Sequence, residues 1–364
     1  MDMLPKVEPF AYTFEFPTYV DLLRHRARQQ PHQYAYTFLI DGEKQELNIT
    51  YEELDRRARA IAAVLQRMVA PGERALLLYP SGLDYVFAFY GCLYAGVIAV
   101  PAYPPSQNRH LERIQAIIAD AQAKIVLTTQ SSLSKLQRSQ QFISELESLS
   151  WLTTEGCFDG EEENWQMPAI NGETIAFLQY TSGSTSMPKG VMVSHHNLMH
   201  NNWQQNLVMG LAPGMSIVCW LPLFHDMGMI GNMIMALYAG VHCVLIAPQV
   251  FLQKPARWLQ AVSRYRASMT CAPNFAYDLC VQRVTPEQME GIDLSSCKVA
   301  ISGAEAVRYH TLVQFWEKFV PYGFQWEAFS PGYGMAEATL AVSLSSVGEA
   351  PLMLHIDRDL LKQG

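Results

Sequence analysis

The segment LQYTSGSTSMPKG, residues 178–190, carries groups that could hold a phosphate. Its glycines, Gly183 and Gly190, let backbone N–H groups converge on an anion, its hydroxyl side chains add donors, and Lys189 adds a positive charge. An apolar run precedes the segment and the alternating run GVMVSH follows it, so we expect a loop between two strands. It is not a Walker A sequence, which needs Gly-Lys-Ser/Thr leading into a helix. These residues alone leave two interpretations open, a polar hairpin turn and a phosphate-binding loop.

A second polar segment is LPLFHDMGMIG, residues 221–231, which contains the pair His225–Asp226. Such a pair contributes to the metal site of the HD phosphohydrolases, but no spacing in this sequence selects the further histidine and aspartate ligands. The simpler interpretation is a strand-to-helix loop in which Asp226 caps the helix.

Two more segments follow towards the C-terminus. ISGAEAV, residues 301–307, indicates a strand, a turn of small residues and a helix. FSPGYGMAEATL, residues 329–340, brings Tyr333 and Glu337 close together in sequence. Taken alone, such a glutamate is more often a solvated helix residue than a ligand.

Together these segments resemble the adenylate-forming superfamily, the acyl- and aminoacyl-adenylating enzymes. TSGSTSMPKGVMVSHHNL, residues 181–198, is similar to their phosphate-loop signature, and the later segments follow in the order that the family shows. The resemblance extends from about residue 15 to the C-terminus. Within the superfamily, three stretches resemble the fatty acyl-AMP ligases, relatives of the fatty acyl-CoA ligases that pass acyl groups to carrier proteins: PAYPP (101–105), WLPLFHDMG (220–228) and TCAPNFAYDLC (270–280).

The resemblance implies that a fatty-acid carboxylate attacks the α-phosphorus of ATP, giving acyl-AMP and pyrophosphate, with Mg²⁺ as cofactor and an acyl carrier protein as acceptor. The implied catalytic residues are Lys189, His225 beside the acyl carboxylate and α-phosphate, and Glu337, which holds Mg²⁺ with the hydroxyl of Thr185. Nucleotide contacts are implied for the phosphate loop and for the two later segments: Thr181, Ser182, Gly183, Ser184, Thr185, Lys189, Gly303, Ala304, Glu305, Tyr333, Gly334 and Met335.

An apolar tunnel for the acyl chain is expected from methionine and other large apolar residues, because methionine adapts to irregular aliphatic shapes. Ordinary core packing is the alternative for each of them. The candidate tunnel residues are Met229, Ile230, Gly231, Asn274, Phe275 and Tyr277.

The chains of the resembling family are considerably longer, whereas this sequence ends at LLKQG, just past the Glu337 segment. We therefore expect the large N-terminal domain alone, without the ribose-binding aspartate and the small C-terminal domain with its catalytic lysine. Two alternatives stay open: a truncated, non-catalytic chain that only binds nucleotide and acyl ligand, and a fatty acyl-CoA ligase. A serine hydrolase is disfavoured because the sequence contains no GxSxG motif.

The elements that must position these residues alternate between strands and helices. TYEE, residues 50–53, is a capping-box pattern that predicts the start of an amphipathic helix. ERALLLYP reads as a buried strand, LDYVFAFYGCLYAG as a helix and VIAVPAYPP as the next strand, and this order recurs after residue 170. The sequence therefore predicts an α/β fold, and the resemblance specifies two stacked, mostly parallel sheet subdomains with flanking helices. We place the first at residues 10–170 and the second, with the ATP and acyl sites, at residues 171–364, divided at the acidic stretch GEEENWQMPAING.

Composition excludes several classes of protein. A chain of 364 residues with 49% hydrophobic and 16% charged residues has a large core, and its net charge of −8 argues against a general nucleic-acid binder. The seven cysteines are scattered and never spaced CxxC, so we expect reduced core residues in a cytoplasmic protein. The most apolar run, residues 85–100, is too short to span a bilayer and fits a buried helix followed by a strand.

Overall fold

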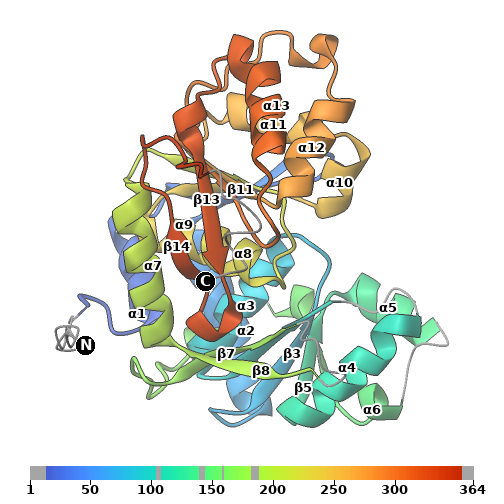
Figure 1. The fold of residues 1–364 in the computed structure, drawn as a ribbon. Coiled ribbons are helices and arrows are strands. Elements are labelled where there is room, and N and C mark those ends of the chain that lie inside the picture. The colour runs from blue at the N-terminus through green and yellow to red at the C-terminus, as the bar shows by residue number, and fades with distance from the viewer. Residues whose placement is uncertain (1–13, 104–107, 139–143, 158–159, 182–187, 355–364) are drawn as a thin grey trace, which may run out of the picture.

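The computed structural model describes residues 14–103, 108–138, 144–157, 160–181 and 188–354. Two β-sheets lie one above the other, with helices between and around them (Figure 1). The predicted α/β class, with two stacked and mostly parallel sheets, is confirmed.

The first sheet has six strands, and all neighbouring pairs are parallel except the last, β7 with β8. Their order across the sheet is β6 (Ser150–Thr153), β5 (Ile125–Thr128), β3 (Arg74–Leu78), β4 (Ile98–Ala102), β7 (Ile175–Tyr180) and β8 (Gly190–Ser194).

The second sheet has eight strands, of which the two outermost pairs are antiparallel and the inner pairs parallel. Their order is β14 (Ala341–Leu344), β13 (Phe329–Gly334), β12 (Val299–Ser302), β11 (Met269–Ala272), β9 (Ser216–Cys219), β10 (His242–Ile246), β1 (Tyr34–Leu39) and β2 (Glu46–Thr50).

Helices cover the sheets and fill the space between them. The largest are α1 (Tyr19–Gln29), α2 (Tyr51–Met68), α3 (Leu83–Ala95), α4 (Asn108–Ala121), α5 (Gln130–Arg138), α7 (His195–Met209), α11 (Ala256–Arg264), α12 (Asn274–Arg283) and α13 (Tyr309–Phe319). Shorter pieces are α6 (Ser144–Glu147), α8 (Asp226–Gly228), α9 (Met235–Ala239), α10 (Pro248–Gln253) and a π-helix at Met229–Ile234.

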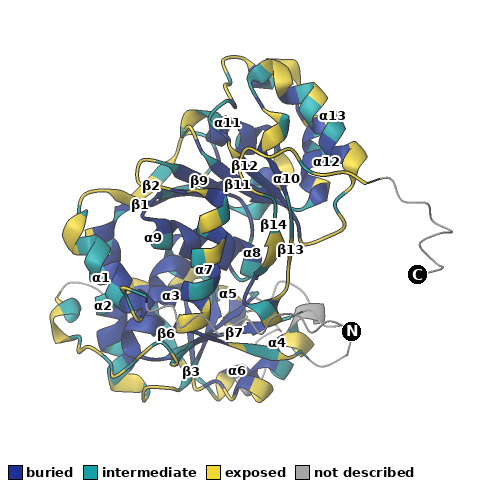
Figure 2. Cartoon of the chain, turned by 60° about the vertical axis from the view of Figure 1, so that its left-hand side comes forward, coloured by how far each residue is buried: buried dark blue, intermediate teal, exposed yellow. Residues whose placement is uncertain are grey.

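Successive side chains of a strand point to opposite faces of the sheet, so a strand that is buried on both faces contributes to two clusters of core residues. In β3, Ala75 and Leu77 belong to the large buried cluster that also includes α3 and the inner faces of both sheets. Leu76 and Leu78 point the other way, into a smaller cluster with the isoleucines of α4. Figure 2 shows the buried residues gathered between the two sheets. The apolar run at residues 85–100 is a buried helix followed by a strand, as predicted.

The strands are not partitioned at residue 170, where we placed the subdomain boundary. β7 and β8 lie after that residue but complete the first sheet, and β1 and β2 lie near the N-terminus but pair in the second. The sequence shows strands and a linker-like stretch, but it does not show which sheet edge a strand joins. The division of the chain into 10–170 and 171–364 therefore does not coincide with the two sheets.

All seven cysteines lie in described parts of the chain, where each is buried and unpaired, as expected of core thiols. Among the helices that the structure describes, none combines the length and the apolar character that crossing a bilayer requires.

Candidate active site

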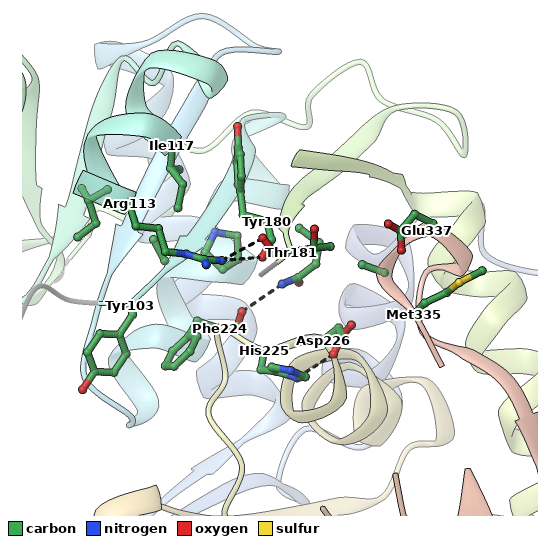
Figure 3. A pocket seen from close by; sticks show the side chains of 15 residues that line it. Tyr103, Arg113, Ile117, Tyr180, Thr181, Phe224, His225, Asp226, Met335 and Glu337 are labelled. Carbon is green, nitrogen blue, oxygen red and sulfur yellow. Dashed lines mark hydrogen bonds and ion pairs between the residues drawn. The ribbon is translucent and has the colours of Figure 1, made fainter. Parts of the chain in front are cut away.

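A cavity of about 700 Å³ opens where the carboxyl ends of β4 and β7 face the loop before α8 and the turn after β13 (Figure 3). Ligands of open α/β sheets bind in this position, outside the carboxyl ends of the strands. The side chains around it come from five separate parts of the chain: Pro101, Ala102, Tyr103, Arg113, Ile114, Ile117, Gln179, Tyr180, Thr181, Phe224, His225, Asp226, Met335, Ala336 and Glu337.

Thr181 and Lys189 bound the predicted phosphate loop. β7 and β8 pair antiparallel as far as Tyr180 and Gly190, and the Thr181 N–H donates to the Lys189 carbonyl at 3.3 Å. The expectation of a loop between two strands is thus confirmed. Thr181 lines the cavity, whereas Lys189 is exposed and is not among its lining residues. The other predicted phosphate contacts lie outside the described residues: Ser182, Gly183, Ser184 and Thr185.

Helix α4 supplies a cationic residue that the sequence reasoning missed. The Arg113 guanidinium donates to the carbonyls of Thr181 at 3.2 Å and Tyr180 at 3.5 Å (Figure 3). The same helix contacts Tyr180 a second time: the Tyr180 hydroxyl donates to the Asp120 carboxylate at 2.5 Å. The clue was the seven-residue spacing of Arg113 and Asp120, which puts both on one side of a helix. Helix α4 therefore fixes the backbone at the start of the phosphate loop.

A buried glutamine was also missed. The Gln179 side chain is 5% exposed, and its Nε2 donates to the Phe224 carbonyl at 3.2 Å. Within the described residues its Oε1 has no hydrogen-bond partner. Buried acceptors are normally satisfied by protein, water or ligand, so this oxygen marks a polar point at the wall of the cavity.

His225 and Asp226 stand at the start of α8. His225 Nδ1 lies 2.7 Å from Asp226 Oδ1, and the histidine side chain is about half exposed while the aspartate is mostly buried. Hydrogen bonding to Asp226 raises the pKa of His225 above its ordinary value, against the opposing effect of burial. The Met227 N–H lies 2.7 Å from Asp226 Oδ1 and 3.3 Å from His225 Nδ1, so it donates to the carboxylate and leaves Nδ1 to carry a proton.

Glu337 lies in a single 3₁₀ turn, Ala336–Ala338, that follows β13, where it is exposed and lines the same cavity as Thr181. Among the described residues there is no cluster of three or more histidine, cysteine, aspartate or glutamate side chains that could hold a metal. Mg²⁺ commonly needs only one or two carboxylates, since waters and substrate phosphates complete its shell. Glu337 and Asp226 are the two carboxylates that line the larger cavity within the described residues.

A second cavity of about 190 Å³ shares His225 and Asp226 with the first. Four of the predicted nucleotide residues line it: Gly303, Ala304, Tyr333 and Gly334. A side chain at position 303 would lie 2.9 Å from the Gly332 carbonyl, so glycine is required for the close approach of β12 and β13. The Tyr333 ring is 60% exposed, which leaves its face open to a planar ligand.

Two other predicted nucleotide residues are placed differently. Met335 lines the larger cavity. Glu305 lines neither cavity, and its carboxylate accepts the Phe275 N–H at 2.7 Å, at the start of α12. This contact indicates a helix-capping role for Glu305.

Of the predicted tunnel residues, only Gly231 lines one of the two cavities. Met229 and Ile230 are fully buried in the core. Hydrogen bonds fix two others: Asn274 holds the Arg308 N–H and the Thr311 hydroxyl, and the Tyr277 hydroxyl donates to the Ile301 carbonyl at 2.8 Å. Phe275 is partly exposed and packs edge-on against Trp220. These contacts are those of packed core residues, and the tunnel assignment stays a prediction.

The sequence profile of the family described as AMP-binding enzyme matches residues 23–360. The chain is 44% identical to the medium-chain-fatty-acid–[acyl-carrier-protein] ligase JamA of Moorena producens, over 96% of this chain and 60% of that protein. It is 38% identical to the putative fatty-acid–CoA ligase fadD21 of Mycobacterium bovis, over 95% of this chain and 61% of that protein.

Among solved structures, the fatty acyl-adenylate ligase of Legionella pneumophila in complex with acyl adenylate and pyrophosphate superimposes with a TM-score of 0.87 and 42% identity. The alignment covers 92% of this chain and 58% of that one. The chain thus spans about three fifths of the length of the relatives it matches. The resemblance found in the motifs is confirmed, and because the family profile extends over most of the sequence, the chain belongs to the AMP-binding enzyme family.

Proposed function

We propose that this chain binds ATP and a fatty acid and activates the acid as an acyl-adenylate, with release of pyrophosphate. The observation that carries the proposal is that Thr181, His225 and Glu337, which are far apart in sequence, line one cavity. The similarity to the Legionella pneumophila ligase, whose structure was solved in complex with acyl adenylate and pyrophosphate, supports it.

The proposed chemistry requires positioning and charge stabilisation more than proton transfer. A fatty-acid carboxylate is already ionised near neutral pH, so it needs no general base to attack the α-phosphorus. The Thr181 hydroxyl, the loop residues 182–185 and Lys189 would hold the β- and γ-phosphates. His225, whose pKa Asp226 raises, would present a positive charge to the carboxylate and the α-phosphate.

Mg²⁺ is part of this proposal. Glu337, together with the hydroxyl of Thr185, would hold it. When bound, it would offset the negative charge that develops on pyrophosphate.

The smaller cavity would receive the adenine. Tyr333 would stack on the ring, while Gly303 and Gly334 would let the backbone approach its edge. The name of the Moorena producens relative favours an acyl carrier protein as the acceptor of the acyl group. The name of the Mycobacterium bovis relative makes coenzyme A the second candidate.

The test is to incubate the 364-residue chain with dodecanoate, ATP and Mg²⁺, and to measure pyrophosphate release and hydroxamate formation with hydroxylamine. Lys189→Ala and Glu337→Ala should each reduce product by about 10²-fold, the usual cost of removing one charge-stabilising group. Lys135→Ala, an exposed lysine on α5, is the matched control and should leave product formation unchanged.

Calorimetric ATP binding separates the remaining alternatives. Binding without product would favour the non-catalytic binder. Equal product and affinity in wild type and in both site variants would show that the assigned residues are not the site. Adding a phosphopantetheinylated carrier protein or coenzyme A to the acyl-adenylate then identifies the acceptor.

A further inference from the structure

The turn that carries Glu337 is strained at a defined residue. Thr339, two positions later, has φ 71° and ψ −57°. A β-branched residue rarely adopts positive φ, because its side chain crowds the neighbouring backbone. The Leu340 N–H donates to the Ala338 carbonyl at 2.9 Å across this residue. This bond closes a three-residue γ-turn of the rare type that has positive φ at its central residue.

A buried side chain of α7 bridges both sides of the strained residue. Asn201 is 5% exposed, and its Nδ2 donates to the carbonyls of Ala338 at 3.3 Å and Ala341 at 3.0 Å. Its Oδ1 accepts the Ala341 N–H at 3.2 Å. Figure 1 shows α7 running beside β14, so the contact joins segments about 140 residues apart in sequence.

The orientation of this amide is itself fixed. Gln205, one turn further along α7 and 2% exposed, donates from Nε2 to Asn201 Oδ1 at 2.8 Å. With donors from both Gln205 and Ala341, Oδ1 is identified as the acceptor, and Nδ2 must face the two carbonyls. The side-chain amide of Asn201 therefore binds the backbone on both sides of Thr339, at Ala338 and at Ala341.

Glu337 depends on this turn for its position. Within the part of the chain that the structure describes, no hydrogen bond or ion pair holds its carboxylate. The backbone that carries Glu337 runs from Met335 to Leu340, and these two residues meet through a hydrogen bond of 2.8 Å from the Met335 N–H to the Leu340 carbonyl.

We propose that Asn201 is a positioning residue, which clamps the strained turn at Thr339 and thereby keeps Glu337 at the cavity that Thr181 also lines. The link to Mg²⁺ rests on the proposed function, whereas the clamp itself does not. If the clamp is lost, the turn can relax out of positive φ and carry Glu337 away from the cavity.

The clamp is tested without any activity by a double-mutant cycle in urea unfolding, using Asn201→Ala, Thr339→Gly and both together. Glycine adopts positive φ without strain, so in the Thr339→Gly background the turn holds no backbone strain that loss of Asn201 could relieve. Asn201→Ala should therefore lower the unfolding midpoint more in that background than in wild type, where relaxation of the turn recovers part of the loss. Additive effects would overturn the proposal.

The second measurement is ATP affinity with Mg²⁺ and with EDTA. Asn201→Ala should weaken binding about tenfold with Mg²⁺, the scale of one lost interaction, and leave binding in EDTA unchanged. In the double variant, Thr339→Gly should restore most of the ATP affinity that Asn201→Ala removes. Equal weakening in both conditions would indicate general damage to the fold and would contradict the positioning role.

Asn206→Ala is the matched control, since Asn206 lies on α7 but caps its own helix end through the Leu211 N–H. It should be additive with Thr339→Gly and should not alter Mg²⁺ dependence. If the wild-type chain binds no ATP in either condition, the proposed function fails, and the unfolding cycle alone then decides the clamp.

Discussion

His225 and Asp226 form an ion pair that lines both cavities, with Nδ1 and Oδ1 2.7 Å apart. The aspartate raises the pKa of His225, chiefly by hydrogen bonding to the imidazolium, so the ring keeps its positive charge to higher pH. The Met227 N–H holds the same carboxylate oxygen at the first turn of α8. The pair therefore places a histidine whose pKa is raised at the wall that the two cavities share.

Asp226→Asn removes the partner of this charge. The pKa of His225 should then fall, so activity that needs the imidazolium is lost at lower pH than in wild type. Near neutral pH the adenylation rate should drop about tenfold or more, since a hydrogen bond to a charged group is worth ~1.5–3 kcal/mol. The pH profile of pyrophosphate release and NMR titration of the His225 ring both measure the shift. Asp293→Asn, a half-exposed aspartate distant in sequence from the site, should change neither.

Arg113 gives a second prediction, because it binds the carbonyls at the start of the phosphate loop. Arg113→Ala should raise the KM for ATP about tenfold, the effect of one or two lost hydrogen bonds, with little change in stability at this exposed position. Arg113→Lys keeps the charge but not the forked donor, so its KM should lie in between. Glu112→Ala, at the neighbouring position of α4, is the control, and a KM unchanged in Arg113→Ala would refute the role.

Much of the fold follows from local patterns in the sequence. The strands and helices were readable because β3 is a short continuous apolar run, typical of a strand buried on both faces, and α2 repeats its apolar residues with a helical period. Thr50 caps α2 by accepting the Glu53 N–H, as its sequence context predicted. The sheet to which β7, β8, β1 and β2 belong was not readable, because strand order depends on contacts between distant segments.

The residues that line the larger cavity were predicted only in part, because some of them belong to no motif. Thr181, His225 and Glu337 line the larger cavity and each sits in a motif, whereas Arg113 lies on a helix without one and Gln179 just precedes the phosphate-loop signature. The tunnel residues stay a prediction. Asn274 and Tyr277 carry polar groups that bind neighbouring backbone or side chains, which no apolar pattern reveals.

Tyr277→Phe distinguishes a core role from a tunnel role. Its hydroxyl donates to the Ile301 carbonyl in a buried setting, so the substitution removes a buried hydrogen bond and should cost ~0.5–1.5 kcal/mol of unfolding free energy. Affinity for fatty acids should stay the same. Tyr309→Phe, at a half-exposed tyrosine, should cost less than about 0.5 kcal/mol. Altered fatty-acid affinity in Tyr277→Phe, with stability unchanged, would support the tunnel assignment.

We predict that two histidines, His195 and His242, lower the stability of the folded protein in acid. Burial lowers the pKa of His195 to about 4 and that of His242 to about 4, where an unfolded chain has about 6.5. The neutral rings are held in place, since His195 Nδ1 accepts the Tyr19 N–H and His242 Nε2 bonds the Thr37 hydroxyl. Below pH ~6.5 the unfolded chain takes up protons that the folded chain refuses, so stability is highest above this pH and falls towards pH ~4.

With both histidines contributing, the unfolding free energy should fall by up to ~2.7 kcal/mol per pH unit within this window. Urea unfolding between about pH 7.5 and 4.5 measures the slope. Because glutamine does not titrate, His195→Gln combined with His242→Gln should flatten this part of the slope even if the variant is less stable at neutral pH. His32→Gln, at a largely exposed histidine, should keep the wild-type slope. An equally steep fall in the double variant would mean that other groups, such as carboxylates freed from their ion pairs, drive acid unfolding.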